Sequence, residues 1–340
     1  MNAAPEPLAE YHGLNAAAFQ AEVVPRYRPA VIRGLVKDWP AVQAARTSSE
    51  TAVAYLAAMD HGAAAEAFVG PPQIEGRFFY RPDMSGFNFE RRKAPFAEVL
   101  RYLLSLEGVE RPPSVYVGAA ALPETLPGFA EQNALELMSS EAAVPRIWVG
   151  NRSVVATHFD LSDNIACVVA GRRRVTLFPP DQLPNLYVGP LDFTMAGQPA
   201  SMVSIRQPDF EEYPRFREAL AAAHVVDLEP GDAIYIPALW WHNIEALSPF
   251  NILVNYWWQN EPPEAGSGLE ALVHGILTIA HLPPEHRTAW RALFDHYVFR
   301  PDGADPVAHL APQHRGILGA PTPQLRRRIR EFLLRGLSRR

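Results

Sequence analysis

The sequence predicts a mainly β protein, a sandwich or barrel of short strands with flanking helices. Three observations support this prediction. Between residues 114 and 258, short runs of β-type residues follow one another without intervening helices. Turn residues bound most of these runs, and the 33 prolines of the chain favour short elements over long helices. Of the 340 residues, 48% are apolar and 20% are charged, which is the balance of a globular protein with a real core.

Residues 1–110 are predicted to form a mixed α/β flank of this core. The apolar run 29–35 has a glycine near its end and is typical of a strand. Further along, apolar side chains recur with a helical period at Phe96, Val99, Leu100, Leu103 and Leu104. This spacing predicts an amphipathic helix over residues 95–106.

Residues 111–260 are predicted to form the β core itself. The predicted strands are 114–117, 146–149, 164–170, 174–178, 224–228, 233–236 and 252–257. Residues 181–223 interrupt the series and are too many for a plain turn, so we expect an insertion that lies over one mouth of the β domain. Cys167 falls inside an apolar run and is expected to be a small core residue.

Residues 261–340, from Pro262-Pro263 onward, are predicted to form helices. Three apolar stripes support this, at Leu269, Leu272, Val273, Ile276 and Leu277, at Trp290, Leu293, Phe294 and Tyr297, and at Leu325, Ile329, Phe332 and Leu333. Thr322 before Pro323 is the expected N-cap of the last helix. Such stripes would form an unusually large apolar surface on a monomer, so we expect a homodimer through these helices. The alternative is that the helices fold back on the β domain.

The charge of the chain is uneven. Its formal net charge is −6, yet the residues after Pro321 carry seven arginines and one glutamate. This distribution indicates that residues 1–321 are acidic and that the terminal helix is basic. The basic face of this helix is either solvated or docked on an acidic partner or nucleic acid. Because an acidic protein binds nucleic acid poorly, nucleic acid is the less favoured partner.

The sequence favours a cytoplasmic protein without a membrane partner. No stretch approaches the roughly 20 apolar residues that span a bilayer. Residues 1–14 contain Glu6 and Glu10 and no apolar run, so they do not resemble a signal peptide. With Cys167 as the only cysteine, an intramolecular disulfide is excluded and a thiolate zinc site is not expected.

Two side chains that can bind a metal, His158 and Asp160, lie two positions apart. On a strand, residues i and i+2 share one face, so both side chains can reach one point. His242, which follows the predicted strand 233–236 and a short loop, is the best third ligand. Two histidines and one carboxylate leave positions open on the metal, which suits iron(II) with a chelating cosubstrate and oxygen. Alone, the His-x-Asp pattern is weak evidence for a metal site. It becomes moderately specific because His242 supplies a third ligand at a plausible position.

An oxygenase that uses 2-oxoglutarate also needs a cation for the distal carboxylate of this cosubstrate. Arg173 follows Gly171 at the start of a predicted strand, and its guanidinium can bind a carboxylate through two hydrogen bonds. Arg172 and Arg174 stand beside it, which leaves the alternative that Arg173 is a surface residue at a turn.

Further motifs accompany these residues. They are His158-Phe-Asp160 with Asn164, Gly171-Arg-Arg-Arg174, Leu177-Phe-Pro-Pro180, Pro208-Asp-Phe-Glu-Glu-Tyr-Pro214, Pro230-Gly-Asp-Ala-Ile-Tyr-Ile-Pro237, Trp240-Trp-His-Asn-Ile-Glu245, and Pro29–Gly34 with Asp38-Trp-Pro40. Together they resemble the cupin-like Jumonji-C (JmjC) hydroxylases, the family of the asparaginyl hydroxylase that modifies hypoxia-inducible factor. The resemblance covers roughly residues 25–260.

This resemblance implies a double-stranded β-helix core, the cupin or jelly-roll fold, in which His158, Asp160 and His242 bind iron(II). The implied cofactors are Fe(II), 2-oxoglutarate as cosubstrate and O2. The implied reaction is hydroxylation of a protein side chain with release of succinate and CO2, and the terminal helices match the dimer contact of the family. Nothing in the sequence resembles a histone-reading module, so demethylation is not favoured. The alternatives are the same chemistry on tRNA or a small metabolite, or a metal-binding cupin module without oxygenase activity.

The resemblance also implies a cosubstrate site. Arg173 matches the position that pairs with the distal carboxylate of 2-oxoglutarate, usually lysine in the eukaryotic hydroxylases, and Tyr116 matches a tyrosine that donates to the same carboxylate. Asn164 and Asn255 match two asparagines near the other end of the cosubstrate. Alternation places Asn255 on one strand face with Trp257, where a buried amide needs a partner.

One departure from the family concerns Val155, where the family tends to carry a threonine three residues before the first histidine. Ser153 or Thr157 could supply the missing hydroxyl. One cosubstrate contact is therefore unassigned.

Overall fold

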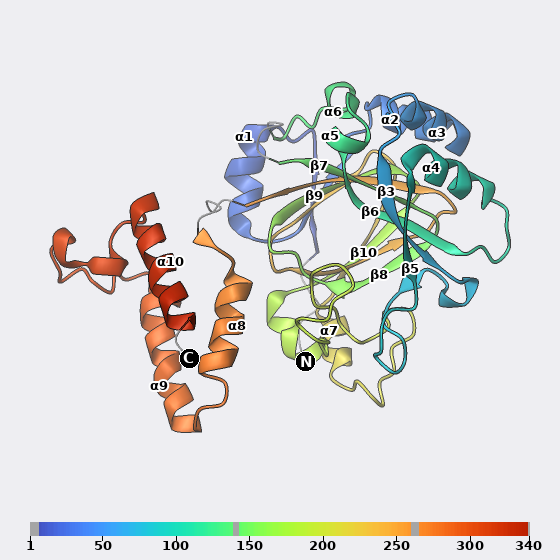
Figure 1. The fold of residues 1–340 in the computed structure, drawn as a ribbon. Coiled ribbons are helices and arrows are strands. Elements are labelled where there is room, and N and C mark those ends of the chain that lie inside the picture. Colours follow the sequence, from blue (N-terminus) through green and yellow to red (C-terminus); the bar gives the residue numbers. More distant parts are fainter. Residues whose placement is uncertain (1–6, 139–142, 260–264, 339–340) are drawn as a thin grey trace. The chain divides into compact units, whose positions relative to one another are not determined.

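The computed structural model describes residues 7–138, 143–259 and 265–338 of the chain (Figure 1). Contacts divide the chain into two compact units, Met1–Trp258 and Gln259–Arg340. The predicted flank 1–110 and nearly all of the predicted core 111–260 share the first unit. The predicted start of the helical region at Pro262-Pro263, and the last two arginines, lie outside the described residues.

The first unit contains a large sheet, and both the predicted flank 1–110 and the predicted core 111–260 contribute strands to it. Its order is β1 (Ala9–His12), β2 (Ala30–Arg33), β12 (Ala233–Ile236), β9 (Asp163–Ala170), β14 (Asn251–Trp258), β7 (Pro145–Gly150), β6 (Ser114–Ala121), β3 (Ala64–Gly70) and β5 (Glu90–Pro95). All neighbours pair antiparallel except β1 and β2, which are parallel. The predicted strand at 29–35 is β2, in the same sheet as the core strands.

A smaller sheet faces it. Its order is β11 (His224–Leu228), β10 (Arg173–Phe178), β13 (Trp241–Ala246), β8 (Ser153–His158) and β4 (Arg77–Phe78). One apolar cluster joins the two sheets, with Val168, Ile234 and Leu253 from the large sheet against Val175 and Leu177 from the small one. From β7 onward the chain crosses repeatedly between the sheets, so this part of the unit is the double-stranded β-helix that the motifs imply.

Helices cover the other face of the large sheet (Figure 1). The helices on this side are α1 (Ala16–Ala18), α2 (Pro40–Thr47), α3 (Ser49–Ala57), α4 (Phe96–Ser105), α5 (Leu122–Thr125) and α6 (Phe129–Gln132), whereas α7 (Phe216–Ala221) packs with residues of the small sheet. The predicted helix over 95–106 is α4, and its stripe Phe96, Val99, Leu100 and Leu103 is buried. Cys167 is buried in the same cluster, as expected of a small core residue.

Three strands of the small sheet, β4, β8 and β13, were not predicted, and two of them carry candidate ligands. The strands β8 and β13 mix polar with apolar residues, because one side of each faces the pocket that holds the candidate ligands rather than a uniform core. Trp240 and Trp241, which fit either packing or a cleft wall by sequence, belong to two separate apolar clusters of the core.

The second unit contains three longer helices, α8 (Gly268–Thr278), α9 (Pro284–Phe294) and α10 (Pro323–Leu337). The Thr322 hydroxyl accepts a hydrogen bond from the Leu325 backbone N–H at 3.1 Å, so the predicted N-cap of α10 is present. None of the three helices buries a side chain within the described residues. The exposed apolar side chains are Leu272, Val273, Ile276, Leu277, Trp290, Leu293, Phe332, Leu333, Leu334 and Leu337. Among the residues described in either unit, no helix combines the length and apolar character that crossing a bilayer requires.

Candidate metal centre

Two paired strands of the small sheet bring the candidate histidines together. His158 is the last residue of β8, and it lies directly opposite His242 of β13 in the antiparallel register. Asp160 is not on the strand, contrary to the expectation from alternation, but in the turn that follows it. The backbone N–H of Leu239 donates to the Asp160 carbonyl at 2.8 Å and ties this turn to the loop before His242.

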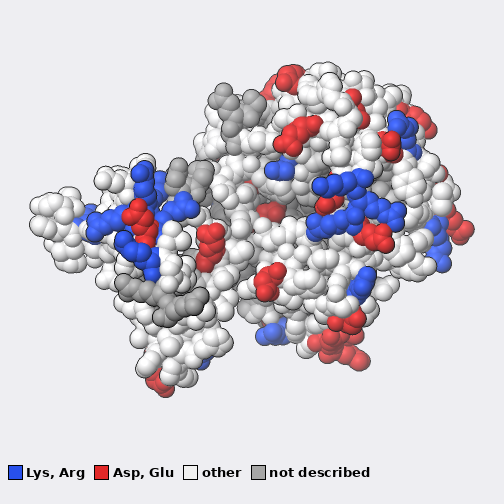
Figure 2. Space-filling view, in the orientation of Figure 1, with Lys and Arg blue, Asp and Glu red and all other residues white. Residues whose placement is uncertain are grey.

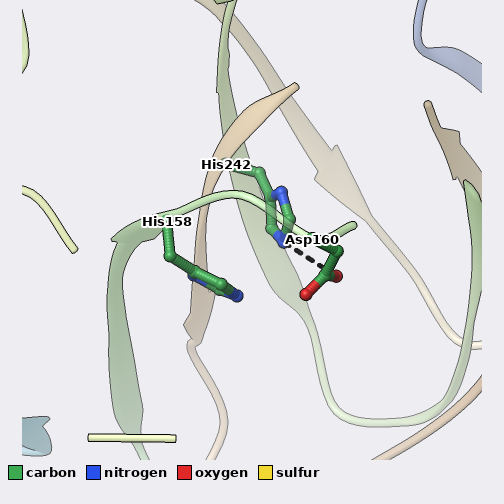
Figure 3. Close-up of side chains that lie close together, drawn as sticks. All are labelled: His158, Asp160 and His242. Carbon is green, nitrogen blue, oxygen red and sulfur yellow. Dashed lines mark ion pairs between the residues drawn. The ribbon is translucent and has the colours of Figure 1, made fainter. Parts of the chain in front are cut away.

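The three side chains converge on one point (Figure 3). One donor atom from each of His158, Asp160 and His242 lies within 4.8 Å of the other two. Each histidine holds its Nδ1 at 2.9 Å from a backbone carbonyl, that of Ala156 for His158 and that of Trp240 for His242. Because a carbonyl only accepts, each Nδ1 carries a proton, and in the neutral ring this leaves the lone pair of Nε2 for a metal.

Burial favours the neutral, metal-binding form of His242. Its side chain is 2% exposed, and loss of solvation together with the nearby His158 lowers its pKa from 6.5 to about 4. Two imidazoles and one carboxylate form a set that fits a divalent transition metal such as iron(II).

The cluster of His158, Asp160 and His242 opens into a pocket of about 300 Å³ between the two sheets. All seven residues that the sequence assigned to metal or cosubstrate line it: His158, Asp160, His242, Tyr116, Asn164, Arg173 and Asn255. They come from β6, β8, β9, β10, β13, β14 and the turn after β8. The sequence separates these residues by up to 139 positions, and the two-sheet fold places them around one cavity.

Arg173 differs from the arginines on either side of it. Its side chain is buried, its Nε has no hydrogen-bond partner among the described residues, and burial lowers its pKa to about 10. Arg172 and Arg174 are instead exposed and pair with Glu229 and Asp227. An unpaired buried guanidinium calls for an anion, so the surface alternative applies to its neighbours and not to Arg173.

The hydroxyl missing at Val155 is not restored inside the pocket. Val155 lines the cavity, whereas Ser153 and Thr157 are absent from its lining. A β-bulge between the Val155 and His158 pairings shifts which side chains face inward, so that Val155, Ala156 and His158 all reach the pocket. The Thr157 hydroxyl is buried without a hydrogen-bond partner in the described residues.

Sequence reasoning missed the partners of the two asparagines. Asn255 Nδ2 donates to Asn164 Oδ1 at 3.1 Å, and Trp148 Nε1 donates to Asn255 Oδ1 at 2.7 Å. Trp257 lines the pocket on the same face as Asn255, as alternation predicts, and donates to Asp160 at 3.0 Å. A buried amide signals that a partner exists, but no local pattern identifies a tryptophan far along the chain as that partner.

An apolar part of the pocket wall was also missed. It is formed by Phe68 of β3, Phe78 of β4 and Met195 of the insertion 181–223. Phe78 stacks on Tyr116 with ring centroids 5.9 Å apart. The insertion therefore contributes to the pocket wall, in keeping with its expected place over one mouth of the β domain.

Comparisons with known proteins agree with this architecture. A family model described as a cupin-like domain matches residues 16–264. The tRNA wybutosine-synthesizing protein 5 of Gallus gallus is 32% identical over 146 residues, with 38% of this chain and 43% of that protein covered. Lysine-specific demethylase JMJ31 of Arabidopsis thaliana is 35% identical over 105 residues, 31% of this chain and 19% of that protein. HSPB1-associated protein 1 of Homo sapiens is 28% identical over 148 residues, 42% of this chain and 30% of that protein.

The matched region spans less than half the length of each of these relatives. The family model, in contrast, covers most of this chain, including the cluster of His158, Asp160 and His242 and every residue of its pocket. The chain therefore belongs to the family of cupin-like domains and is of the Jumonji-C type.

Proposed function

We propose that this protein is an Fe(II)- and 2-oxoglutarate-dependent oxygenase that hydroxylates a protein side chain. The observation that carries the proposal is one pocket that holds both the His158, Asp160 and His242 cluster and a buried, unpaired Arg173. A metal-storage or structural cupin has no need of a buried cation in the same cavity as its metal ligands. A cosubstrate with a distal carboxylate does need one.

In this proposal, different residues of the pocket bind the metal and the cosubstrate. His158, Asp160 and His242 hold the metal, and Arg173 binds the distal carboxylate of the cosubstrate with Tyr116 as a second donor. When bound, iron(II) with 2-oxoglutarate and O2 supplies the oxidising chemistry, and succinate and CO2 leave as products. The aromatic and methionine side chains of the wall make that part of the pocket unfavourable for water.

A second substrate class is supported by one specific observation. The chain is similar to the tRNA wybutosine-synthesizing protein 5 of several vertebrates, with 32% identity in the human protein. The same oxygenase chemistry on a tRNA base is therefore the alternative. The formal net charge of −6 favours a protein substrate, because repulsion from the phosphates weakens binding to tRNA.

The proposal is tested by turnover of 2-oxoglutarate. The protein, supplied with Fe(II) and O2, should form succinate in the absence of added substrate and faster with a true substrate. Replacement of His158, Asp160 or His242 by alanine should abolish this turnover while circular dichroism stays unchanged. Wild-type protein that binds neither iron nor 2-oxoglutarate would contradict the oxygenase proposal.

The substrate class is tested by parallel mass-spectrometric screens of a peptide library and of bulk tRNA. A protein hydroxylase adds the mass of one oxygen atom to peptides, and the His242→Ala variant adds none. Oxidised tRNA nucleosides with unmodified peptides would replace the protein substrate with the tRNA alternative.

A further inference from the structure

The carboxylate of Asp160 is held by donors on one of its two oxygens. Trp257 Nε1 donates to Oδ2 at 3.0 Å, and Asn164 Nδ2 makes a longer contact with the same oxygen at 3.5 Å. The described residues donate no hydrogen bond to Oδ1. An ionised carboxylate has lone pairs on both oxygens, so this arrangement leaves the lone pairs of Oδ1 without a protein donor.

A second path to the same carboxylate starts at another tryptophan. Trp148 donates to Asn255, Asn255 donates to Asn164, and Asn164 contacts Asp160. Both asparagines are buried, at 1% and 4% exposure for Asn255 and Asn164. An indole N–H can only donate and an ionised carboxylate can only accept, so the direction of every hydrogen bond along this path is fixed by its two ends.

The indole of Trp257 is itself held in place. The ring of Trp148 meets it edge to face, with centroids 5.6 Å apart and an interplanar angle of 87°. The guanidinium of Arg146 lies 5.9 Å from the centre of the Trp257 ring. Arg146 is in turn fixed by a hydrogen bond of 3.0 Å from its Nη1 to the carbonyl of Ala119. The donor that reaches Asp160 therefore has little freedom to turn away.

We propose that the indole N–H groups of Trp257 and Trp148 are positioning groups that set the orientation of the Asp160 carboxylate toward the metal, Trp257 directly and Trp148 through Asn255 and Asn164. The inference rests on the proposed function for the identity of the metal ligands. Its physical basis is that partners of a ligating carboxylate restrict its rotation and so lower the entropy lost when the metal binds. Neither tryptophan needs to touch the metal.

The test measures metal binding rather than activity. Metal-free wild type and variants are titrated with Mn²⁺ by calorimetry, and the Co²⁺-loaded proteins are compared by visible absorption. Trp257→Phe keeps an aromatic ring and removes the donor, and it should bind Mn²⁺ about 10–100-fold more weakly. Trp148→Phe should weaken binding in the same direction and by less, since it acts through two amides.

Trp258→Phe is the matched control. Trp258 is the next residue of β14, points to the opposite side and packs on Tyr235 with ring centroids 5.9 Å apart. Its replacement costs core packing and should lower the melting temperature without changing Mn²⁺ affinity. Loss of packing alone cannot move the Co²⁺ absorption bands at saturating metal, whereas a turned carboxylate does. Should Trp257→Phe not fold, Trp257→Met, which also lacks a donor, takes its place.

The outcomes separate this inference from the function. Wild type that binds Mn²⁺, with a folded Trp257→Phe that has the same affinity and the same Co²⁺ spectrum, overturns the positioning role and leaves the oxygenase proposal standing. Wild type that binds no divalent metal overturns the oxygenase proposal first, and the positioning role with it.

Discussion

The imidazole of His242 lies against the carboxylate of Asp160, with Nε2 and Oδ2 3.6 Å apart. His242 is 2% exposed and Asp160 is 14% exposed by side chain, so this pair sits where water screens poorly. The carboxylate favours a proton on the histidine, while burial and the neighbouring His158 oppose it and prevail, so the pKa falls to about 4. The histidine is thus ready to bind a metal at neutral pH.

This depressed pKa predicts a pH-dependent stability of the metal-free protein. The folded state binds its His242 proton only near pH 4, whereas the unfolded chain binds it near pH 6.5, so acid favours unfolding between these values. The free energy of unfolding should fall by up to about 1.4 kcal/mol for each pH unit from this group. Urea unfolding in the presence of a chelator measures it. His242→Leu should flatten the dependence between pH 6.5 and 4, and an equally steep profile in that variant would show that His242 is not responsible.

Because Arg173 is buried and its Nε has no hydrogen-bond partner among the described residues, we expect its replacement to weaken cosubstrate binding strongly. Arg173→Ala should weaken 2-oxoglutarate binding by roughly 1.5–3 kcal/mol, the range for a hydrogen bond to a charged group. Arg173→Lys should recover part of this loss, since the charge returns without the planar fork. Calorimetric titration with 2-oxoglutarate in the presence of Mn²⁺ measures the affinity. Arg172→Ala is the control, because Arg172 is exposed and pairs with Glu229. A larger loss in the control than in Arg173→Ala would move the assignment to the neighbour.

Tyr116 supplies the second donor to the same carboxylate in our proposal. Tyr116→Phe keeps the ring that stacks on Phe78 and removes only the hydroxyl. The expected loss in 2-oxoglutarate affinity is about 1.5–3 kcal/mol, the range for a hydrogen bond to a charged group. The same titration checks it, with the melting temperature as the control for packing. Unchanged affinity would remove Tyr116 from the cosubstrate site.

The exposed stripes of the second unit predict a homodimer. Phe332 is 67% exposed and Leu333 45% exposed on α10, and Leu272 and Val273 are each 52% exposed on α8. Burying such side chains across a two-fold axis is worth roughly 1.5 kcal/mol or more for each. Light scattering should find a dimer at micromolar concentration and a monomer for Phe332→Glu. Arg327→Glu lies on the opposite side of α10, changes the charge more and should remain dimeric. A monomeric wild type would contradict the prediction.

The sequence by itself determined several local elements and selected three candidate metal ligands. The runs at 224–228 and 233–236 form strands with the predicted bounds; burial alternates along the first and is continuous along the second. The N-cap at Thr322 fixed the start of α10 because its hydrogen bond spans only three residues. The motif around His158, together with His242, identified the candidate ligands because these side chains have few other uses in such a pattern.

Only the tertiary structure decided what holds those ligands. Trp257 and Asp160 are 97 positions apart and meet because β14 pairs with β9 in the large sheet. Alternation predicted Asp160 on the same strand face as His158, but β8 ends at His158, so Asp160 lies beyond the strand. Periodicity records which side of an element avoids water, and it carries no information about which distant strand comes to lie beside it. Hydrogen-bond partners across a sheet depend on that neighbour and its register, so they emerge only when the two sheets close around the pocket.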